Sequence, residues 1–321
     1  MSAEFDLIRR HFTRPALRSP LGVGDDCALL QPASGMQLAV SSDMLVAGRH
    51  FLSTVAPELL GHKALAVNLS DLAACGAEPL AFTLALALPQ ADERFIAGFA
   101  KGLFALADQH HIELVGGDTT AGPLNICITV MGQVPPGAAL LRSGARVGDE
   151  WWVSGRLGDA RLALEVFRGA LQLPGEQFAQ VRAAMEQPQP RVQLGLALRG
   201  LASSAIDLSD GLVGDIGHIL RASGVGAQLR LMDLPRSPIL AAQSAELQRL
   251  CLLAGGDDYE LLFSAPPAAH AAVLAAASRV GVAVSCCGLV SAGPGLQVMD
   301  AQGQDVSQGL QGFDHFSDGH E

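Results

Sequence analysis

The sequence predicts an α/β protein built from two domains. Apolar strand-like runs alternate with helix-like runs along the chain, and the tripeptide Pro135-Pro136-Gly137 interrupts the alternation. The chain has 321 residues, of which 49% are hydrophobic, enough for a substantial core in each of two domains of ordinary size. We expect the boundary near residues 138–148 and assign the domains to residues 1–140 and 141–321.

In the first domain, one helix carries a stop signal and one strand has an unusual composition. A helical run over residues 58–75 ends at Gly76, a residue type that terminates helices. Residues 82–88 are so apolar that we expect this strand to be buried on both faces. The other expected elements are a strand over residues 38–42 that ends at Asp43, a helix over 93–110, and strands at 114–115 and 126–134.

The second domain is expected to continue the alternation. A strand over residues 150–154 follows the Gly-rich stretch after Arg142. The other expected elements are helices at 159–171, 191–201, 212–222 and 268–280, and strands at 204–207, 227–231, 259–263 and 283–290. We expect residues 317–321 to form a frayed tail.

The charge balance restricts the function. The formal net charge is -11, whereas a nucleic-acid-binding protein normally presents a basic face, so we expect no nucleic-acid partner. If the protein handles phosphates, metal ions must supply most of the positive charge. No run approaches the ~20 apolar residues of a membrane span. The start of the chain also lacks the features of a signal peptide, and we expect a cytoplasmic protein with no membrane partner.

The cysteines suggest the same compartment. The six cysteines include no C-x-x-C pair, and we expect free structural thiols rather than a zinc site or disulfides.

Carboxylates gather in short segments rich in glycine and serine. These segments are Gly24-Asp25-Asp26, Ser41-Ser42-Asp43, Gly116-Gly117-Asp118, residues 207–211 and residues 255–260, and Asp71 stands alone in an apolar helical run. Each segment taken alone is typical of a turn or a helix cap. Asp71 requires a further explanation, because a charge among apolar neighbours must be paired or metal-bound if it is buried.

Taken together, the acids indicate a magnesium-dependent phosphate site. Most of them follow apolar strands, where α/β folds place ligands. Oxygen ligands without cysteine suit Mg²⁺, which bridges to substrate phosphates. Two anionic phosphates can approach each other only if charge between them is neutralised, and this catalysis is mostly positioning and electrostatics.

The usual nucleotide signatures are absent from the sequence. There is no Walker loop, no convincing dinucleotide fingerprint and no protein-kinase motif set, and no G-x-S-x-G elbow supports a serine hydrolase. The run from Gly155 to Asp159 leads from a strand into a helix, so its amides either meet phosphate or simply begin the helix.

Several blocks of the sequence resemble the thiamine-monophosphate kinases. The blocks occur in the order found in that family and span nearly the whole chain. They are residues 21–28, Ser41-Ser42-Asp43 with residues 46–51, residues 63–77, 116–120, 141–145, 206–212, 255–261 and the closing residues 312–316.

The resemblance implies a fold, a reaction and an assembly. The fold is that of aminoimidazole ribonucleotide synthetase, in which two N-terminal sheets pair into a dimeric barrel and ATP lies between the domains. The implied reaction is direct transfer of a phosphoryl group from ATP to thiamine phosphate, with several Mg²⁺ ions and no phosphoenzyme. It forms thiamine diphosphate, the last step in the biosynthesis of that compound. The implied assembly is a homodimer whose N-terminal domain binds ATP and metal.

The resemblance also implies roles for individual residues. The implied metal ligands are Asp26, Ser41, Ser42, Asp43, Asp71, Asp118, Asp207 and Asp210. ATP contacts are implied for Gly117, Asp118, Arg142, Ser209 and His110, and thiamine phosphate contacts for His50, Asp257 and Phe313. Arg142 suits a phosphate but is alternatively a surface charge. Phe313 suits a cation–π contact with the substrate but is alternatively an apolar anchor. His50 is a hydrogen-bond donor to phosphate or a packing residue. Lys63 either reaches phosphate from the helix that carries Asp71 or, as we expect, is a solvated helix-face lysine.

Three positions depart from the family pattern. Asp257 stands where Glu is common, Phe313 where Tyr or Trp is expected, and His110 where a tyrosine near adenine often occurs. The rival interpretations are a related synthetase of selenophosphate or aminoimidazole ribonucleotide, a phosphatase, and a non-catalytic binder of thiamine phosphates. The number of acids argues against a binder, because binding alone does not require so many.

Overall fold

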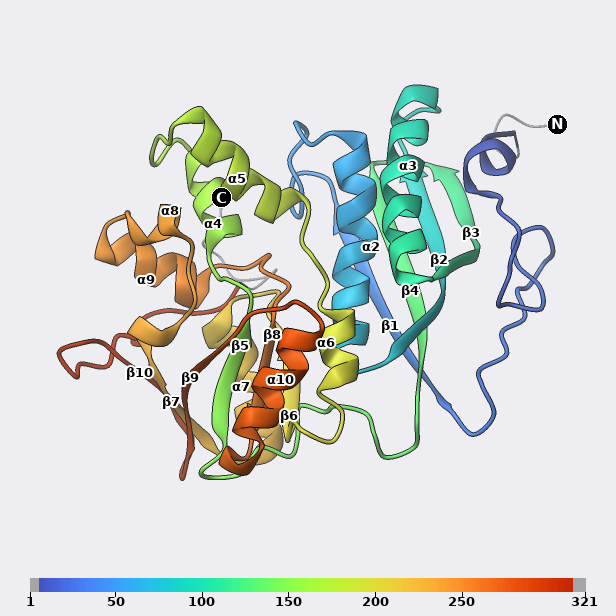
Figure 1. Cartoon of the computed structure of the whole chain (residues 1–321). Helices are drawn as coiled ribbons and strands as arrows, with labels where there is room; N and C mark the ends of the chain where they lie inside the picture. The colour runs from blue at the N-terminus through green and yellow to red at the C-terminus, as the bar shows by residue number, and fades with distance from the viewer. Residues whose placement is uncertain (1–5, 314–321) are drawn as a thin grey trace. The chain divides into compact units, whose positions relative to one another are not determined.

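The computed structural model describes residues 6–313, which fall into two compact units (Figure 1). Unit 1 comprises residues up to 72 together with 77–139, and unit 2 comprises residues 73–76 together with those from 140 onward. The tail expected at residues 317–321 and most of the closing block at 312–316 lie outside the described residues.

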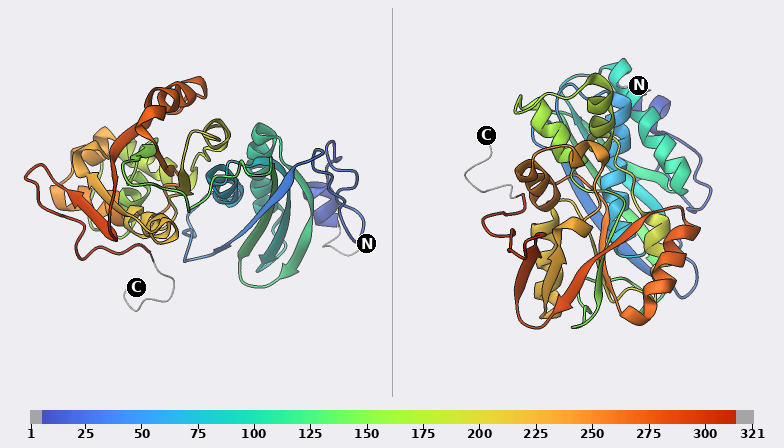
Figure 2. Two further views of the ribbon diagram at one scale, coloured as in Figure 1. Left: turned by 90° about the horizontal axis from the view of Figure 1, so that it is seen from below. Right: turned by 60° about the vertical axis from the view of Figure 1, so that its left-hand side comes forward.

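Unit 1 is a mixed sheet of four strands with two long helices on one face (Figures 1 and 2). The strand order is β1-β4-β2-β3, and all neighbours are antiparallel except the parallel pair β2 and β3. The elements are η1 (Ile8–Phe12), β1 (Gln37–Val46), α2 (Pro57–Ala74), β2 (Glu78–Leu88), α3 (Glu93–His110), β3 (Glu113–Ala121) and β4 (Asn125–Val134).

Helix α3 has the bounds that the sequence predicted, and local chemistry fixes both of its ends. The Asp92 side chain accepts hydrogen bonds from the backbone N–H groups of Arg94 and Phe95, which otherwise lack partners in the first turn. At the other end His111 adopts the left-handed conformation with φ of 52°, which closes the last turn.

The sheet of unit 1 leaves one face open, so the expectation that residues 82–88 are buried on both faces is wrong. Phe82, Leu84 and Leu86 are buried beneath the helices, but Ala85 is exposed. Apolar side chains of β1 are also exposed, among them Leu38 at 48%, Val40 at 63% and Met44 at 52%. Side chains alternate across a strand, so this apolar composition does not require burial on both faces.

Gly117 in strand β3 is required by the close approach of β2. Its φ of +150° disfavours other residues, and a Cβ atom there would lie 1.8 Å from the Leu84 carbonyl oxygen. The Gly-Gly-Asp segment was expected at the end of a strand, but it lies within β3, as Asp43 lies within β1.

Unit 2 is built around a sheet of six strands in the order β10-β7-β9-β5-β8-β6, in which only the pair β10 and β7 is parallel. Trp151, Trp152 and Phe263 are among its fully buried side chains. The strands are β5 (Glu150–Ser154), β6 (Ser204–Asp207), β7 (Gly226–Arg230), β8 (Leu261–Ala265), β9 (Val284–Ser291) and β10 (Gly295–Met299). The helices are α4 (Asp159–Phe167), α5 (Gly175–Glu186), α6 (Val192–Ala197), α7 (Leu212–Ser223), η2 (Leu231–Asp233), α8 (Pro238–Ala241), α9 (Ala245–Ala254), η3 (Pro267–Ala269) and α10 (His270–Arg279).

The bounds of β5 and β6 match the prediction, whereas α5, α8, α9 and β10 were not predicted. Among residues 6–313, no helix is both long enough and apolar enough to span a membrane.

Candidate active site

The first group of predicted ligands lies where helix α2 packs against strand β1. The Ser41 hydroxyl donates a hydrogen bond of 2.5 Å to Asp71 Oδ2. Asp43 lies two residues further along the same face of β1, and its backbone N–H donates to Asn68 Oδ1 over 3.1 Å. Around Asp71 the helix carries the buried side chains Leu65, Leu69 and Leu72, whereas Asp71 itself is half-buried. The structure therefore brings Ser41 and Asp71 into contact, with Asp43 on the same face of β1.

The structure does not bring the Ser42 hydroxyl to this group. Ser42 lies on the open face of the sheet, where its hydroxyl bonds to Thr129 Oγ1 at 2.9 Å and donates to the Ile128 carbonyl at 3.2 Å. Asp118 is exposed on β3, where it pairs with Ala85.

Asp26 and His50 lie on turns at the edge of unit 1. Asp26 is exposed in a loop closed by the hydrogen bond of 2.9 Å from the Leu29 N–H to the Leu21 carbonyl. The His50 Nδ1 atom accepts from the Val46 backbone N–H over 3.0 Å. The neutral His50 ring therefore carries its proton on Nε2, from where it can donate to an anion.

Lys63 on α2 is buried, with 2% of its surface exposed, so the expectation of a solvated lysine is wrong. Helix α2 is covered on more sides than its sequence pattern indicated, since Asn68 and Ser70 are buried as well. A position that looks polar on a helical wheel is therefore interior here.

His110 ends helix α3, and its Nε2 atom is buried without a hydrogen-bond partner among the described residues. Burial, with the neighbouring His62 and His111, lowers the pKa of His110 to about 4. The ring is therefore neutral near pH 7, so it can stack or hydrogen-bond but cannot supply a positive charge to a phosphate.

In unit 2, three acids crowd the junction between β6 and α7. Asp207 ends the strand with 6% exposure, and Asp215 in the first turn of α7 has 3% exposure. Asp215 Oδ2 accepts the Asp210 backbone N–H over 3.1 Å. Burial, and then the charges of Asp207 and Asp210, raise the pKa of Asp215 to about 8.

Two of the three residues predicted to contact thiamine phosphate are held to this same turn by backbone hydrogen bonds. The Asp257 N–H donates to the Ser209 carbonyl over 2.9 Å, and the Phe313 N–H donates to the Asp210 carbonyl over 2.9 Å. Asp257 and Phe313 are therefore anchored to adjacent residues, one an expected ATP contact and the other an expected metal ligand.

Arg142 is an exposed cation of unit 2 that lies toward α7. Its backbone carbonyl accepts from the Ser223 hydroxyl at 3.1 Å. Burial lowers the pKa of His218 on α7, and the Arg142 charge lowers it further, while Asp210 acts in the opposite sense. Arg142 and Asp210 thus both lie within electrostatic range of His218.

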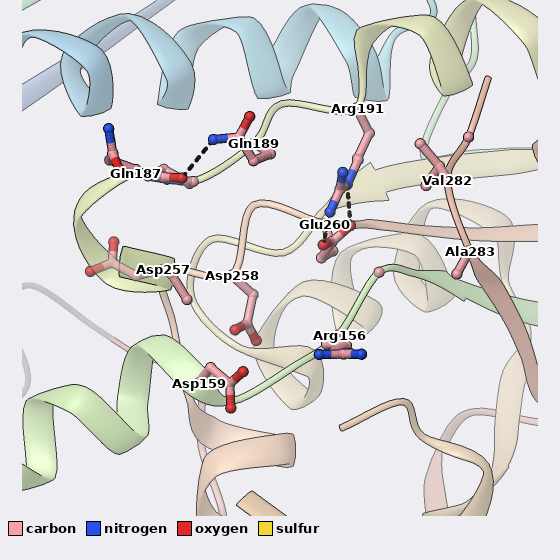
Figure 3. A pocket seen from close by; sticks show the side chains of 14 residues that line it. Arg156, Asp159, Gln187, Gln189, Arg191, Asp257, Asp258, Glu260, Val282 and Ala283 are labelled. Atoms are coloured by element: carbon pink, nitrogen blue, oxygen red, sulfur yellow. Dashed lines mark hydrogen bonds and ion pairs between the residues drawn. The ribbon is translucent and has the colours of Figure 1, made fainter. Parts of the chain in front are cut away.

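A cavity of about 360 Å³, lined by several charged side chains, opens beside Asp257 within unit 2 (Figure 3). Arg191 pairs with Glu260 through Nε at 2.7 Å and Nη2 at 2.5 Å. Burial raises the pKa of Asp258 well above its usual value, and the charges of Glu260 and Asp159 add to this effect. The remaining labelled lining residues in Figure 3 are Arg156, Gln187, Gln189, Val282 and Ala283.

The donor chemistry of both units fits magnesium. Within residues 6–313, no three His, Cys, Asp or Glu side chains form a complete metal site. The ion is commonly held by one or two carboxylates together with substrate phosphates, so an incomplete protein site is expected for it. Beside burial, the charges of Asp207 and Asp210 raise the pKa of Asp215, and a cation bound at this turn would offset those two charges.

Comparison with known proteins decides the family. Residues 24–134 match the family model described as AIR synthase related protein, N-terminal domain, and residues 146–301 match AIR synthase related protein, C-terminal domain. A thiamine-monophosphate kinase from Salmonella typhimurium is 45% identical over 320 residues, covering 98% of each chain.

The chain belongs to the thiamine-monophosphate kinase family.

Solved structures support the family and the fold. Thiamine-monophosphate kinase from Stenotrophomonas maltophilia has a TM-score of 0.85 at 44% identity, covering 94% of this chain and 96% of that chain. AaThiL, solved in complex with AMPPCP and TMP, has a TM-score of 0.76 at 27% identity, covering 97% of this chain and 96% of that chain. The predicted two-domain α/β fold of the aminoimidazole ribonucleotide synthetase type is thus confirmed for this member of the thiamine-monophosphate kinase family.

In this member of the thiamine-monophosphate kinase family, two residues of the candidate site were not predicted from the sequence. Asp215 follows Asp210 by five residues. Its position in the first turn of a helix, just after an acidic turn, was the sequence feature that could have identified it. Tyr259 donates from its hydroxyl to Asp257 Oδ1 over 3.1 Å, a contact that only the folded segment shows.

Proposed function

We propose that the protein transfers a phosphoryl group from ATP to thiamine phosphate and forms thiamine diphosphate and ADP. The 45% identity with the Salmonella typhimurium thiamine-monophosphate kinase over 98% of both chains carries this proposal. It is further supported by a neighbour of similar fold that binds AMPPCP and TMP.

We propose that magnesium ions bind at acids of both units. Asp26, Asp43, Asp71 and Asp118 in unit 1 and Asp207 and Asp210 in unit 2 are the proposed carboxylate ligands, with Ser41 and Ser42 as further oxygen donors. Bound magnesium would neutralise the phosphate charges and polarise the phosphoryl group. The protein's part is positioning: the bond from Ser41 fixes the Asp71 carboxylate, and the Asp210 N–H fixes that of Asp215.

The proposed ATP contacts are Gly117, Asp118, His110, Arg142 and Ser209. Of these, Arg142 carries a permanent charge suited to a phosphate, while His110 is restricted to a neutral contact by its lowered pKa. We assign ATP and metal binding mainly to residues 1–140 and the remainder of the site to residues 141–321.

The proposed thiamine phosphate contacts are His50, Asp257 and Phe313. The Nε2 proton of His50 suits the phosphate end, and the Phe313 ring suits the cationic thiazolium. The anchoring of Asp257 and Phe313 to Ser209 and Asp210 supports their acting on one substrate.

We also propose a homodimer formed through the open sheet face of unit 1. Contiguous exposed apolar side chains, such as Val40 at 63% and Met44 at 52%, are typical of an interaction surface. We propose that the protein acts in the cytoplasm, since ATP is available there and none of the six cysteines, which all lie within residues 6–313, forms a disulfide.

One assay tests the proposed reaction. The purified protein should form thiamine diphosphate and ADP from thiamine phosphate and ATP, and only with Mg²⁺ present. Consumption of ATP with a purine ribonucleotide, and none with thiamine phosphate, would instead favour the related synthetase.

A further inference from the structure

The segment from Asp257 to Glu260 has an unusual backbone. Asp257 and Tyr259 have φ of 67° and 49°, and among the described residues other than glycine only His111 is also left-handed. L-residues adopt this conformation at a cost, so a segment with two of them requires firm anchors and is a candidate for function. Asp tolerates this region better than most residues.

Anchors hold the backbone of the segment on both sides. The Tyr259 N–H donates to the Leu208 carbonyl over 2.8 Å, and the Leu208 N–H donates to the Glu260 carbonyl over 2.9 Å. The Asp258 carboxylate accepts the Gly158 N–H over 2.9 Å.

The Glu260 side chain adds a further anchor. Its carboxylate accepts from Arg191 and, over 2.5 Å, from the Ser154 hydroxyl. Ser154 Oγ also accepts the Leu261 N–H over 2.8 Å. Together these bonds fix where the Asp257 Cα atom lies, but they do not fix where its carboxylate points.

The direction of the Asp257 carboxylate is set by a second residue. Tyr259 is 8% exposed, so its ring is held by packing and its hydroxyl occupies a defined position. That hydroxyl donates to Asp257 Oδ1 over 3.1 Å. Asp257 lines the cavity shown in Figure 3, where its carboxylate points away from Asp258 and Glu260, and the hydrogen bond from Tyr259 holds the carboxylate in that direction.

We propose that Tyr259 is a positioning residue for thiamine phosphate, acting through its hydroxyl on the Asp257 carboxylate. This inference rests on the proposed function. A carboxylate that is held in place accepts a hydrogen bond from the amino group of the substrate's pyrimidine ring with less loss of rotamer freedom. The effect therefore belongs to recognition of thiamine phosphate and not to ATP or the metal.

A double-mutant cycle tests the proposal. Tyr259→Phe should raise the KM for thiamine phosphate about five- to tenfold, as expected for losing one typical hydrogen bond that acts on the substrate through Asp257. The kcat and the KM for ATP should change by less than about twofold, since neither depends on this contact. In an Asp257→Ala background, Tyr259→Phe should have no further effect on the KM.

Ser264→Ala is the matched control, because it also removes a buried hydroxyl of unit 2, but one that bonds to Ser204 Oγ and not to the segment from Asp257 to Glu260. It should lower thermal stability and leave the KM for thiamine phosphate unchanged. Additive effects of Tyr259→Phe and Asp257→Ala, or an equal KM change in Ser264→Ala, would overturn the positioning role. Absence of product with the wild-type protein would instead overturn the proposed function itself.

Discussion

The Phe313 backbone N–H donates to the Asp210 carbonyl oxygen over 2.9 Å, which ties the end of the described chain to the acidic turn after strand β6. The main chain makes this bond, so a substitution of the Phe313 side chain leaves it in place. The contribution of the ring can therefore be measured separately from the anchoring of the segment.

Phe313→Ala should weaken thiamine phosphate binding without unfolding unit 2. A cation–π contact of about 0.5–2 kcal/mol corresponds to a rise in KM of about 2- to 30-fold. Phe313→Trp, which restores an aromatic residue of the kind expected in the family, should keep the KM at or below the wild-type value. Steady-state kinetics check this, and an unchanged KM in Phe313→Ala would contradict a substrate contact.

Asp71→Asn should reduce turnover by about 100-fold or more, because charge stabilisation in phosphoryl transfer depends on correctly held metal ions. The Asn side chain can still accept the hydrogen bond from Ser41, so circular dichroism and the Tm should stay close to the wild type. Asp233→Asn is a suitable control, because Asp233 pairs with Arg230 on the surface. Wild-type turnover in Asp71→Asn would contradict the metal assignment.

Asp215→Asn should stabilise the metal-free protein and weaken its response to magnesium. Burial, with the charges of Asp207 and Asp210, raises the pKa of Asp215 to about 8, so near neutral pH folding must protonate this carboxyl, at a cost in stability that Asn does not carry. The Asn amide oxygen can still accept the Asp210 N–H, but it cannot ionise beside a bound cation. Thermal melts with and without Mg²⁺ check this. We expect a higher Tm than the wild type without Mg²⁺ and a smaller rise when Mg²⁺ is added.

His110 should make the protein less stable in acid. Its pKa is lowered from 6.5 to about 4 on folding, so between these values the unfolded chain binds more protons and stability falls as the pH falls. His110→Tyr removes this group. Its Tm should drop by ~2–4 °C less than that of the wild type between neutral pH and about pH 4.5. Equal drops in the two proteins would show that His110 does not titrate in this way.

Val40→Lys should dissociate the proposed dimer. The charge would stand on the open sheet face, where Val40 is 63% exposed in the single chain, and burying it unpaired is costly. Sedimentation velocity should show monomers for Val40→Lys. Leu274→Lys on helix α10 is the matched control, as Leu274 is an apolar residue of unit 2 that is 44% exposed and is not part of the unit 1 sheet. It should leave the oligomeric state of the wild type unchanged.

Prediction from sequence succeeded where local signals were complete. Helix α3 has an N-cap at Asp92 and a continuous amphipathic pattern, and its bounds were predicted correctly. The prediction was wrong where a pattern has two solutions. The apolar run in β2 suits a strand buried on both faces as well as one with a face of small residues, and only the register decides.

The sequence could suggest which residues belong to the candidate site, but it could not show how they are arranged in space. Ser41 and Ser42 are adjacent in sequence, yet strand alternation sends their hydroxyls to opposite faces of β1. Lys63 lies on a helix that is covered on more sides than one, which no helical pattern reveals. The contact between Tyr259 and Asp257 depends on the left-handed backbone conformation of these same two residues, which their residue types do not predict.

Gly117 limits how this sequence can diverge over evolutionary time. Any residue other than glycine would place its Cβ atom 1.8 Å from the Leu84 carbonyl oxygen, so no exchange of a neighbouring side chain can compensate. The conflict is with main chain, which remains when every other position of β2 and β3 has drifted. A distant relative with this sheet should therefore still be recognisable by a glycine directly before the aspartate that corresponds to Asp118.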